Sequence, residues 1–298
     1  MSIGPQNLEA NAASALPVLA KLPDFIGIGP PRTATTWLHE MLTGSVGLPD
    51  QVKETNFFRW NYDKGLDWYV SLFRNAPSDR PIGEFSPNYF AASEARERIA
   101  RHIPKCKIIC TLRDPVERLY SNYRKMYEQA YFLGSFEESL ERRPDLLEWS
   151  RYALHLMRWI DAFGRESVLV LIHDDLKEDP QTFLDRACDF IGIPSISLSE
   201  KSRVSDRVNA ITNAPKYPRV AMAARLVKDR LEAAGLYRVI RLLDRGGLRK
   251  ALFAGGPTFA PLRKDTEAWL RDYFRADVES LEKILDCNLQ NWKKELPA

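Results

Sequence analysis

The chain has 298 residues, of which 45% are hydrophobic and 28% are charged, a balance typical of a folded globular protein. Its 43 basic and 40 acidic residues leave a net charge of only +3, which argues against nucleic acid or an acidic membrane surface as a partner. The four cysteines lack the paired spacing of a zinc site, and such isolated thiols favour a reducing compartment. Because neither a signal peptide nor a membrane-spanning run is recognisable, we expect a cytoplasmic protein without a membrane partner.

Strands and helices alternate along the predicted domain, which follows a loose tail at residues 1–22 that is rich in Ala, Asn and Pro. Continuous apolar runs predict three buried strands, at 25–29, 108–112 and 168–172. Amphipathic patterns and a proline in the first turn predict the helices, around 37–42, from Pro115 onward and at 180–191. Apolar strands that alternate with helices predict an α/β fold, with a P-loop-like parallel sheet flanked by helices on both faces.

The C-terminal part is organised differently, because strand patterns are no longer recognisable there. Residues from about 204 to 259 contain an Arg- and Lys-rich helical stretch followed by pairs of glycines, which predicts a helical insertion or lid. A long amphipathic helix closes the chain, with apolar positions from Trp269 to Leu285. We therefore expect a single domain over residues 23–298 that includes this insertion.

An anion-binding loop is predicted at residues 27–37, where the first strand turns into the first helix. The free N–H groups and the dipole of a helix N-terminus attract phosphate, and Arg32 adds a positive charge. The residues predicted to bind are Pro31, Arg32, Thr33, Ala34, Thr35, Thr36 and Trp37. The alternative is a plain strand-to-helix turn in which the threonines serve as caps.

This loop differs from the loop of nucleoside-triphosphate-binding proteins. That loop ends in Gly-Lys-Ser/Thr, whereas Ala34-Thr35-Thr36 stands here. Asp174 and Asp175 follow the third strand and are the candidate Mg²⁺ ligands, but aspartate is also common where strands turn into loops. We therefore expect no metal site and keep a kinase or NTPase only as a rival interpretation.

A second anion-binding motif is predicted at the end of the second apolar strand, in the segment 111–121. Arg113 leaves the strand at the carboxyl edge of the sheet, where ligands of such sheets bind. Ser121 lies on the following helix, on the face that it shares with Arg118. An arginine and a serine hydroxyl would hold a second phosphate there. The alternatives are an ion pair between Arg113 and Asp114 and a Ser121 that simply lies on a helix face.

Together the two motifs resemble those of the PAPS-dependent sulfotransferase superfamily, in particular its heparan-type and bacterial branch. PAPS is 3′-phosphoadenosine 5′-phosphosulfate. The resemblance implies that the loop around Arg32 binds the 5′-phosphosulfate and that Arg113 and Ser121 bind the 3′-phosphate. It runs from Phe25 to about Ile193 and includes further segments, at 53–58, 84–90 and 152–159.

The sequence departs from the family pattern at three positions. The family loop usually has Lys where Arg32 stands and Gly where Ala34 stands. In the heparan-type branch, a Lys occupies the position of Phe85. The cation that stabilises the leaving phosphate must therefore come from elsewhere, and Lys53 is the nearest candidate in the sequence.

The resemblance implies in-line sulfuryl transfer without a metal, in which a general base removes a proton from the acceptor. By position in the Glu-x-x-Phe-Phe segment, Glu54 is the predicted base, and the alternative is a solvated carboxylate beside Lys53. Glu84 is the second candidate, with a capping or structural carboxylate as its alternative. His39 lies close to the phosphate loop and is the third candidate. His155 is expected to pack or to hydrogen-bond within its helix.

The acceptor is expected to be a small molecule or a carbohydrate, with its hydroxyl or amine as the reacting group. Aromatic residues are dense over 57–73, and part of them would form the core while others line an acceptor pocket. A second rival interpretation is a module that binds the nucleotide without turnover, in which Glu54 has no catalytic role.

Overall fold

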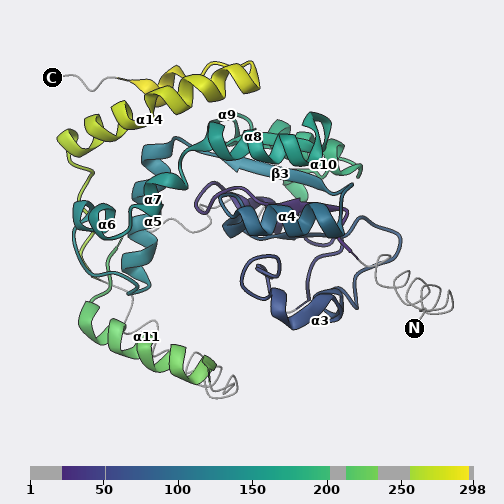
Figure 1. The fold of residues 1–298 in the computed structure, drawn as a ribbon, viewed down its shortest axis with the longest axis horizontal. Helices are drawn as coiled ribbons and strands as arrows, with labels where there is room; N and C mark the ends of the chain where they lie inside the picture. Colours follow the sequence, from purple (N-terminus) through teal and green to yellow (C-terminus); the bar gives the residue numbers. More distant parts are fainter. Residues whose placement is uncertain (1–21, 51, 202–212, 234–255, 295–298) are drawn as a thin grey trace, which may run out of the picture. The chain divides into compact units, whose positions relative to one another are not determined.

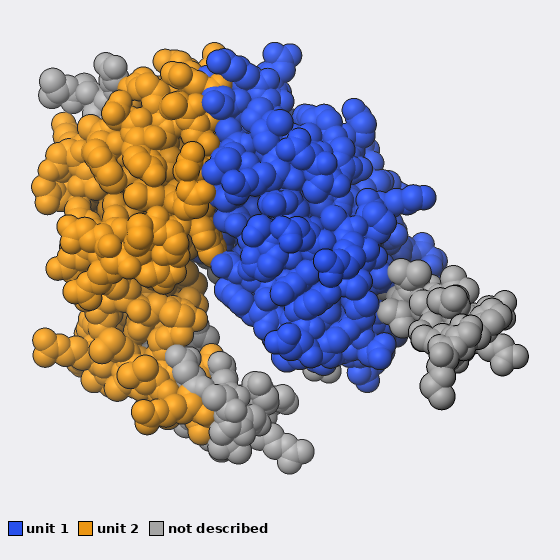
Figure 2. Space-filling view, in the orientation of Figure 1, with its two compact units in different colours: residues 1–113, 152–208, 280–287 blue, residues 114–151, 209–279, 288–298 orange. Residues whose placement is uncertain are grey.

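The computed structural model describes residues 22–50, 52–201, 213–233 and 256–294 (Figure 1). The chain forms two compact units, each built from segments that are separated in the sequence (Figure 2). The first unit contains residues 1–113, 152–208 and 280–287, and the second contains 114–151, 209–279 and 288–298. The predicted tail at 1–22 lies outside the described residues except for Leu22, and so does most of the predicted lid at 204–259.

A parallel sheet forms the centre of the first unit, with the strand order β2-β1-β3-β4. The strands are β1 at Phe25–Gly27, β2 at Gly83–Phe85, β3 at Lys107–Leu112 and β4 at Val168–Ile172. The three strands expected from apolar runs are confirmed, although β1 ends at Gly27. The fourth, β2, was not predicted, because it is only three residues long and has Glu84 at its centre.

Helices cover the sheet of the first unit. They are α2 at Thr35–Leu42, α3 at Gly65–Ser71, α4 at Ser93–His102, α8 at Tyr152–Phe163, α9 at His173–Glu178 and α10 at Pro180–Ile191. Short 3₁₀ turns occur at Tyr62–Lys64, Pro87–Tyr89, Arg165–Ser167 and Leu198–Lys201. The predicted α/β fold with a parallel sheet flanked by helices is thus confirmed.

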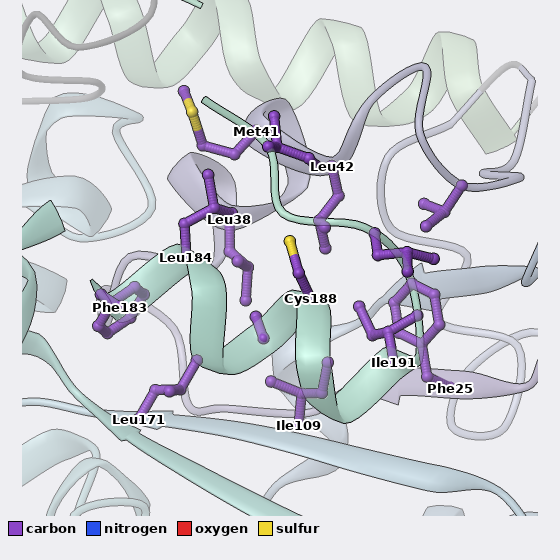
Figure 3. Packing of buried hydrophobic residues seen from close by; sticks show 14 of the residues in the cluster. Phe25, Leu38, Met41, Leu42, Ile109, Leu171, Phe183, Leu184, Cys188 and Ile191 are labelled. Carbon is purple, nitrogen blue, oxygen red and sulfur yellow. The ribbon is translucent and has the colours of Figure 1, made fainter. Parts of the chain in front are cut away.

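The main apolar core lies between α2, α10 and one face of the sheet (Figure 3). Leu38 of α2 and Leu184 of α10 are fully buried against strand residues such as Ile109. Side chains alternate along a strand, so Ile108 and Cys110 point to the opposite face. Both are also fully buried, which means that the second face is covered too. Helix α8 contacts β3 and β4 and packs against α4.

The second unit is helical in its described part. Its helices are α5 at Pro115–Glu128, α6 at Phe136–Arg142, α7 at Asp145–Glu148, α11 at Pro218–Ala233 and most of α14 at Lys264–Leu285, followed by a 3₁₀ turn at Gln290–Lys293. In the described part of the chain, no helix combines the length and the apolar character that a membrane span requires.

Helix α5 begins as its sequence predicts, with Pro115 at the first helical position. The Asp114 carboxylate caps it by accepting hydrogen bonds from the N–H groups of Val116 (2.9 Å) and Glu117 (3.1 Å). The same carboxylate is 3.1 Å from the guanidinium of Arg271 on α14. The start of α5 is therefore tied to a residue 157 positions later in the chain.

All four cysteines are free thiols. Cys106, Cys110 and Cys188 are buried in the first unit, and burial raises the pKa of each thiol. Cys287 is exposed.

Candidate active site

The predicted anion-binding loop connects β1 to α2 at the carboxyl edge of the sheet. Two of its residues have a left-handed backbone, Arg32 with φ 78° and Ala34 with φ 77°. Ala34 is the N-cap of α2 and offers no side chain to cap the helix. Because the first N–H groups of a helix have no partner within it, this N-terminus can donate to an anion. Arg32 and Thr36 are half-buried beside it.

The base of the loop is fixed to strand β3. A Cβ atom on Gly29 would lie 2.4 Å from the Thr111 hydroxyl, so only glycine permits this close approach. The buried Thr33 hydroxyl donates to the Pro30 carbonyl at 2.7 Å and is 2.7 Å from the Thr111 hydroxyl. These bonds occupy the Thr33 hydroxyl, so a contribution of Thr33 to anion binding would come from its backbone N–H.

Two further residues of the predicted loop are directed into the protein. The Trp37 ring packs edge-on against Phe183 of α10, with centroids 5.7 Å apart. Thr35 is 5% exposed. Among the polar side chains of the loop, those of Arg32 and Thr36 are half-buried, whereas those of Thr33 and Thr35 are buried.

A lysine from outside the loop reaches its end. The Lys53 ammonium donates to the Thr36 hydroxyl at 2.6 Å and lies 3.3 Å from the Glu54 carboxylate. Both side chains keep part of their surface in solvent, 27% for Lys53 and 35% for Glu54. The arrangement joins a cation, a hydroxyl at the helix N-terminus and a carboxylate within one chain of contacts.

His39 lies on α2, one turn after the loop. Burial, and to a smaller extent the charge of Lys53, lower the pKa of His39 to about 4. The imidazole is therefore neutral near pH 7. Its ring packs edge-on against Phe85 with centroids 5.7 Å apart. These contacts make His39 a poorer candidate base than Glu54.

Phe85, which stands where the family pattern has a lysine, belongs to the apolar core. It is fully buried and packs edge-on against Phe25 at 6.0 Å. The lysine contact with the loop comes instead from Lys53, the residue that the sequence suggested as a replacement.

Glu84, the second candidate base, is completely buried at the centre of β2. Its carboxylate accepts hydrogen bonds from four hydroxyl groups, those of Thr55, Tyr69 (2.7 Å), Ser86 (2.8 Å) and Tyr89 (3.3 Å). Burial raises the pKa of Glu84, and these hydrogen bonds act in the opposite direction. A carboxylate enclosed in this way has no face open to an acceptor, so the geometry favours a structural role.

This buried network holds the segment that carries Lys53 and Glu54. Thr55 follows Glu54 directly, and its hydroxyl also accepts from the Phe57 N–H and lies near the Tyr89 hydroxyl, both at 3.2 Å. Local sequence patterns do not reveal this role for Thr55, Tyr69 and Tyr89. The signal that points to it is the charged Glu84 between two buried residues.

The two residues predicted to bind the 3′-phosphate belong to different units. Arg113 is half-buried directly after β3 and is the last residue of its segment in the first unit. Ser121 is buried on α5 in the second unit. Arg118 is fully buried and donates to the Ser150 hydroxyl and to the Leu146 carbonyl, so it supports α5 from inside the second unit.

The carboxylates considered as metal ligands are engaged in ion pairs. Asp174 is 2.8 Å from Lys177, and Asp175 is 3.0 Å from Arg186. Among the described residues, His, Cys, Asp and Glu side chains form no group of three or more that could hold a metal ion. His155 is buried on α8 and packs edge-on against Phe90, as expected of a core histidine.

Known proteins with similar sequences share one activity. Residues 22–220 match the family model described as "Sulfotransferase domain". The chain is 34% identical over 292 residues to the human bifunctional heparan sulfate N-deacetylase/N-sulfotransferase 3, covering 89% of this chain and 30% of that protein. It is 30% identical over 291 residues to the mouse enzyme 4 of the same kind, with the same coverage. The chain thus spans about 30% of the length of these relatives.

A solved structure has the same fold. The sulfotransferase from Alicyclobacillus acidocaldarius superimposes with a TM-score of 0.64 at 21% identity, covering 92% of this chain and 99% of that one. At this identity the likeness is evidence for the fold alone.

The comparison corrects the predicted cytoplasmic location. The heparan sulfate N-deacetylase/N-sulfotransferases are enzymes of the Golgi lumen, so the relatives contradict that prediction. The inference from isolated thiols fails for a physical reason. Cys106, Cys110 and Cys188 are buried, and a thiol without access to a partner or an oxidant stays free in any compartment.

The parallel sheet, the matching family model and the similar relatives all lead to one assignment. The donor of this family is PAPS. The chain belongs to the sulfotransferase family.

Proposed function

We propose that the protein transfers the sulfuryl group of PAPS to an amine or hydroxyl group of a carbohydrate, with Glu54 as general base. The observation that carries this proposal is the position of Lys53, between Thr36 of the phosphate loop and Glu54. Lys53 would thereby provide a positive charge for the leaving phosphate, and the neighbouring Glu54 would provide a base for the acceptor. The names of the relatives, heparan sulfate N-deacetylase/N-sulfotransferases, support a carbohydrate acceptor.

The donor would be held mainly by backbone groups and cations. The N-terminus of α2 and Arg32 would bind the 5′-phosphosulfate, because a helix N-terminus and a guanidinium both favour anions. Arg113, directly after β3, would bind the 3′-phosphate, which would distinguish PAPS from adenosine 5′-phosphosulfate. A contribution of Ser121 stays a prediction from the sequence. Because the N-cap Ala34 has no polar side chain, the first N–H groups of α2 would be available to the ligand.

The reaction exchanges one sulfur–oxygen bond for a bond between sulfur and the acceptor. The acceptor nitrogen or oxygen attacks the sulfur in line, while its proton passes to the Glu54 carboxylate. The bond between sulfur and the 5′-phosphate oxygen breaks, and 3′-phosphoadenosine 5′-phosphate leaves. Lys53 and Arg32 would stabilise the charge that develops on that oxygen.

Two variants separate the two roles. Glu54→Gln keeps the shape and removes the basicity, so it should lower turnover about 10²–10⁴-fold and leave binding of 3′-phosphoadenosine 5′-phosphate nearly unchanged. Lys53→Ala should lower turnover and also weaken that binding. Glu97→Gln makes the same change at an exposed position on α4 and serves as the matched control.

The rate is measured with radiolabelled PAPS and amino-sugar oligosaccharides, and binding by calorimetry. Normal turnover in Glu54→Gln would reject Glu54 as the base. Binding of the product without any turnover of the wild type would favour a nucleotide-binding module. Stronger thermal stabilisation by ATP with Mg²⁺ than by 3′-phosphoadenosine 5′-phosphate would favour a kinase or NTPase.

A further inference from the structure

A groove on the second unit has no role in the chemistry described above. It runs between the end of α5 and the start of α11 and offers about 480 Å³. Its wall includes Tyr127, Leu133, Lys216, Tyr217, Arg219 and Val220. We call it the α11 groove. It combines two cations, two phenol rings and a small apolar surface, and no acidic residue lines it.

The positive charge of the protein is concentrated beside this groove. The described segment 213–233 has five basic and two acidic residues, a net charge of +3, which equals the net charge of the whole chain. The remaining residues therefore contain equal numbers of basic and acidic side chains. Lys216 and Arg219 are exposed and form no ion pair with any residue that the structure describes. Their charges are available to an anion.

Aromatic rings accompany these cations. Tyr217 is 50% exposed, and the Lys216 ammonium lies 5.4 Å from the centre of its ring. The Tyr131 ring is 58% exposed, with the guanidinium of Arg225 over its face. The Tyr127 ring packs edge-on against Phe259, with ring centroids 5.6 Å apart. Exposed rings beside cations provide a flat apolar face next to an anion-binding point.

We propose that the α11 groove binds an anionic stretch of a polysaccharide acceptor. Carboxylate or sulfate groups of the sugars would pair with Lys216 and Arg219, and sugar rings would lie on the face of Tyr217. The inference rests on the proposed carbohydrate acceptor and adds to it a separate contact surface for the acceptor on the second unit. A groove lined by both phenol rings and cations suits alternating apolar and anionic surfaces, which charged sugar chains present.

The test measures polysaccharide binding without PAPS, so that its result does not depend on catalysis. The probe is an unsulfated polysaccharide with one carboxylate per disaccharide, and dextran is the neutral comparison. The double variant Lys216→Ala/Arg219→Ala should bind the anionic polymer about 3- to 30-fold more weakly, as expected for the loss of two exposed ion pairs. Arg101→Ala/Lys105→Ala removes the same charge from exposed positions of the first unit and should change binding less than about 2-fold.

A second pair of variants tests the aromatic contact at constant charge. Tyr217→Ala should weaken binding of the polymer, and Tyr217→Phe should retain it, because the ring face is the same. In transfer assays, the Lys216/Arg219 variant should show a higher KM for the polymer at an unchanged kcat, and unchanged kinetics with a monosaccharide acceptor.

Three outcomes would overturn the proposal. They are wild-type binding in both double variants, equal weakening by the control variant, and binding of phosphatidylserine vesicles that requires Lys216 and Arg219 while polysaccharide binding does not. Failure of the proposed function has a different signature, since no carbohydrate of any length would then accept the sulfuryl group. Transfer to a monosaccharide together with unaltered polymer binding in the groove variant would reject the groove alone.

Discussion

Replacing Thr55 by Val would remove one hydroxyl from the network around Glu84 and leave the shape of the side chain unchanged. That hydroxyl donates to the Glu84 carboxylate, accepts from the Phe57 N–H at 3.2 Å and lies 3.2 Å from the Tyr89 hydroxyl. All of these groups are buried, so water cannot replace the lost partner.

The expected cost follows from the three contacts. A hydrogen bond to a charged group contributes about 1.5–3 kcal/mol, and a long neutral one about 0.5 kcal/mol. Thr55→Val should therefore lower the free energy of unfolding by about 2.5–4 kcal/mol. Thr43→Val is the matched control, since Thr43 is exposed and its hydroxyl donates to the His39 carbonyl at 2.8 Å. It should cost less than about 1 kcal/mol.

The loss should also depend on pH. Burial raises the pKa of Glu84 above its ordinary 4.5, so the folded state holds this proton more tightly than the unfolded state does. The stability that this proton contributes is fully present below pH 4.5 and is lost as the pH rises through the pKa that Glu84 has in the folded state. The hydrogen bond from Thr55 lowers the pKa of Glu84 in the folded state. Without this bond that pKa should be higher, so the variant should lose stability up to a higher pH than the wild type does. The variant and the wild type should therefore differ least at acid pH.

Urea denaturation at about pH 4 and about pH 8 measures both effects, because the midpoint and slope give the free energy of unfolding. A difference between Thr55→Val and wild type that is below about 1 kcal/mol would refute the role assigned to the network. If Thr55→Val and wild type differed in free energy of unfolding by the same amount at both pH values, the loss would not depend on the protonation of Glu84.

Three further changes test other parts of the structure. Ala34→Gly should raise the free energy of unfolding by about 0.5 kcal/mol in urea, because glycine adopts a left-handed backbone without a steric cost, and a clear loss would contradict this. Arg271→Met should lower the free energy of unfolding by about 3–5 kcal/mol near neutral pH, because it removes the ion-pair partner of the buried Asp114 carboxylate. Without Arg271 the pKa of Asp114, already raised by burial above 3.8, should rise further, so the loss should shrink toward acid pH, and melting curves that coincide at all pH values would exclude the ion pair. Arg113→Ala should weaken binding of 3′-phosphoadenosine 5′-phosphate by about 1.5–3 kcal/mol in calorimetry and leave adenosine 5′-phosphosulfate nearly unaffected, whereas equal weakening of both would move the 3′-phosphate contact elsewhere.

The fold was predictable where burial is continuous along the chain. Strands β3 and β4 are apolar on both faces, and α10 begins at Pro180 and ends at Ile191, as its pattern indicates. Strand β2 could not be recognised, because Glu84 at its centre is buried and accepts hydrogen bonds from hydroxyl groups of residues up to 29 positions away. In the sequence, a buried glutamate cannot be told from an exposed one when its hydrogen-bond partners lie far away along the chain.

The parts of the candidate site that come directly after a strand could be predicted from the sequence. The loop after β1 and Arg113 after β3 lie at the carboxyl edge of the sheet, as parallel topology requires. The contact between Lys53 and Thr36 joins residues 17 positions apart and depends on how the intervening chain folds. The use of the Thr33 hydroxyl inside the loop likewise depends on Thr111, 78 positions later. Motif patterns identified these residues and not their partners.

Because three of the four cysteines are buried, the number of thiols that react with a reagent distinguishes folded from unfolded molecules. A thiol-specific reagent should modify the exposed Cys287 in the native protein and all four cysteines after unfolding. A dye attached to Cys287 would therefore label the wild-type sequence at one defined position. The rate at which Cys106, Cys110 and Cys188 become modified would report how often the first unit opens, without any engineered probe.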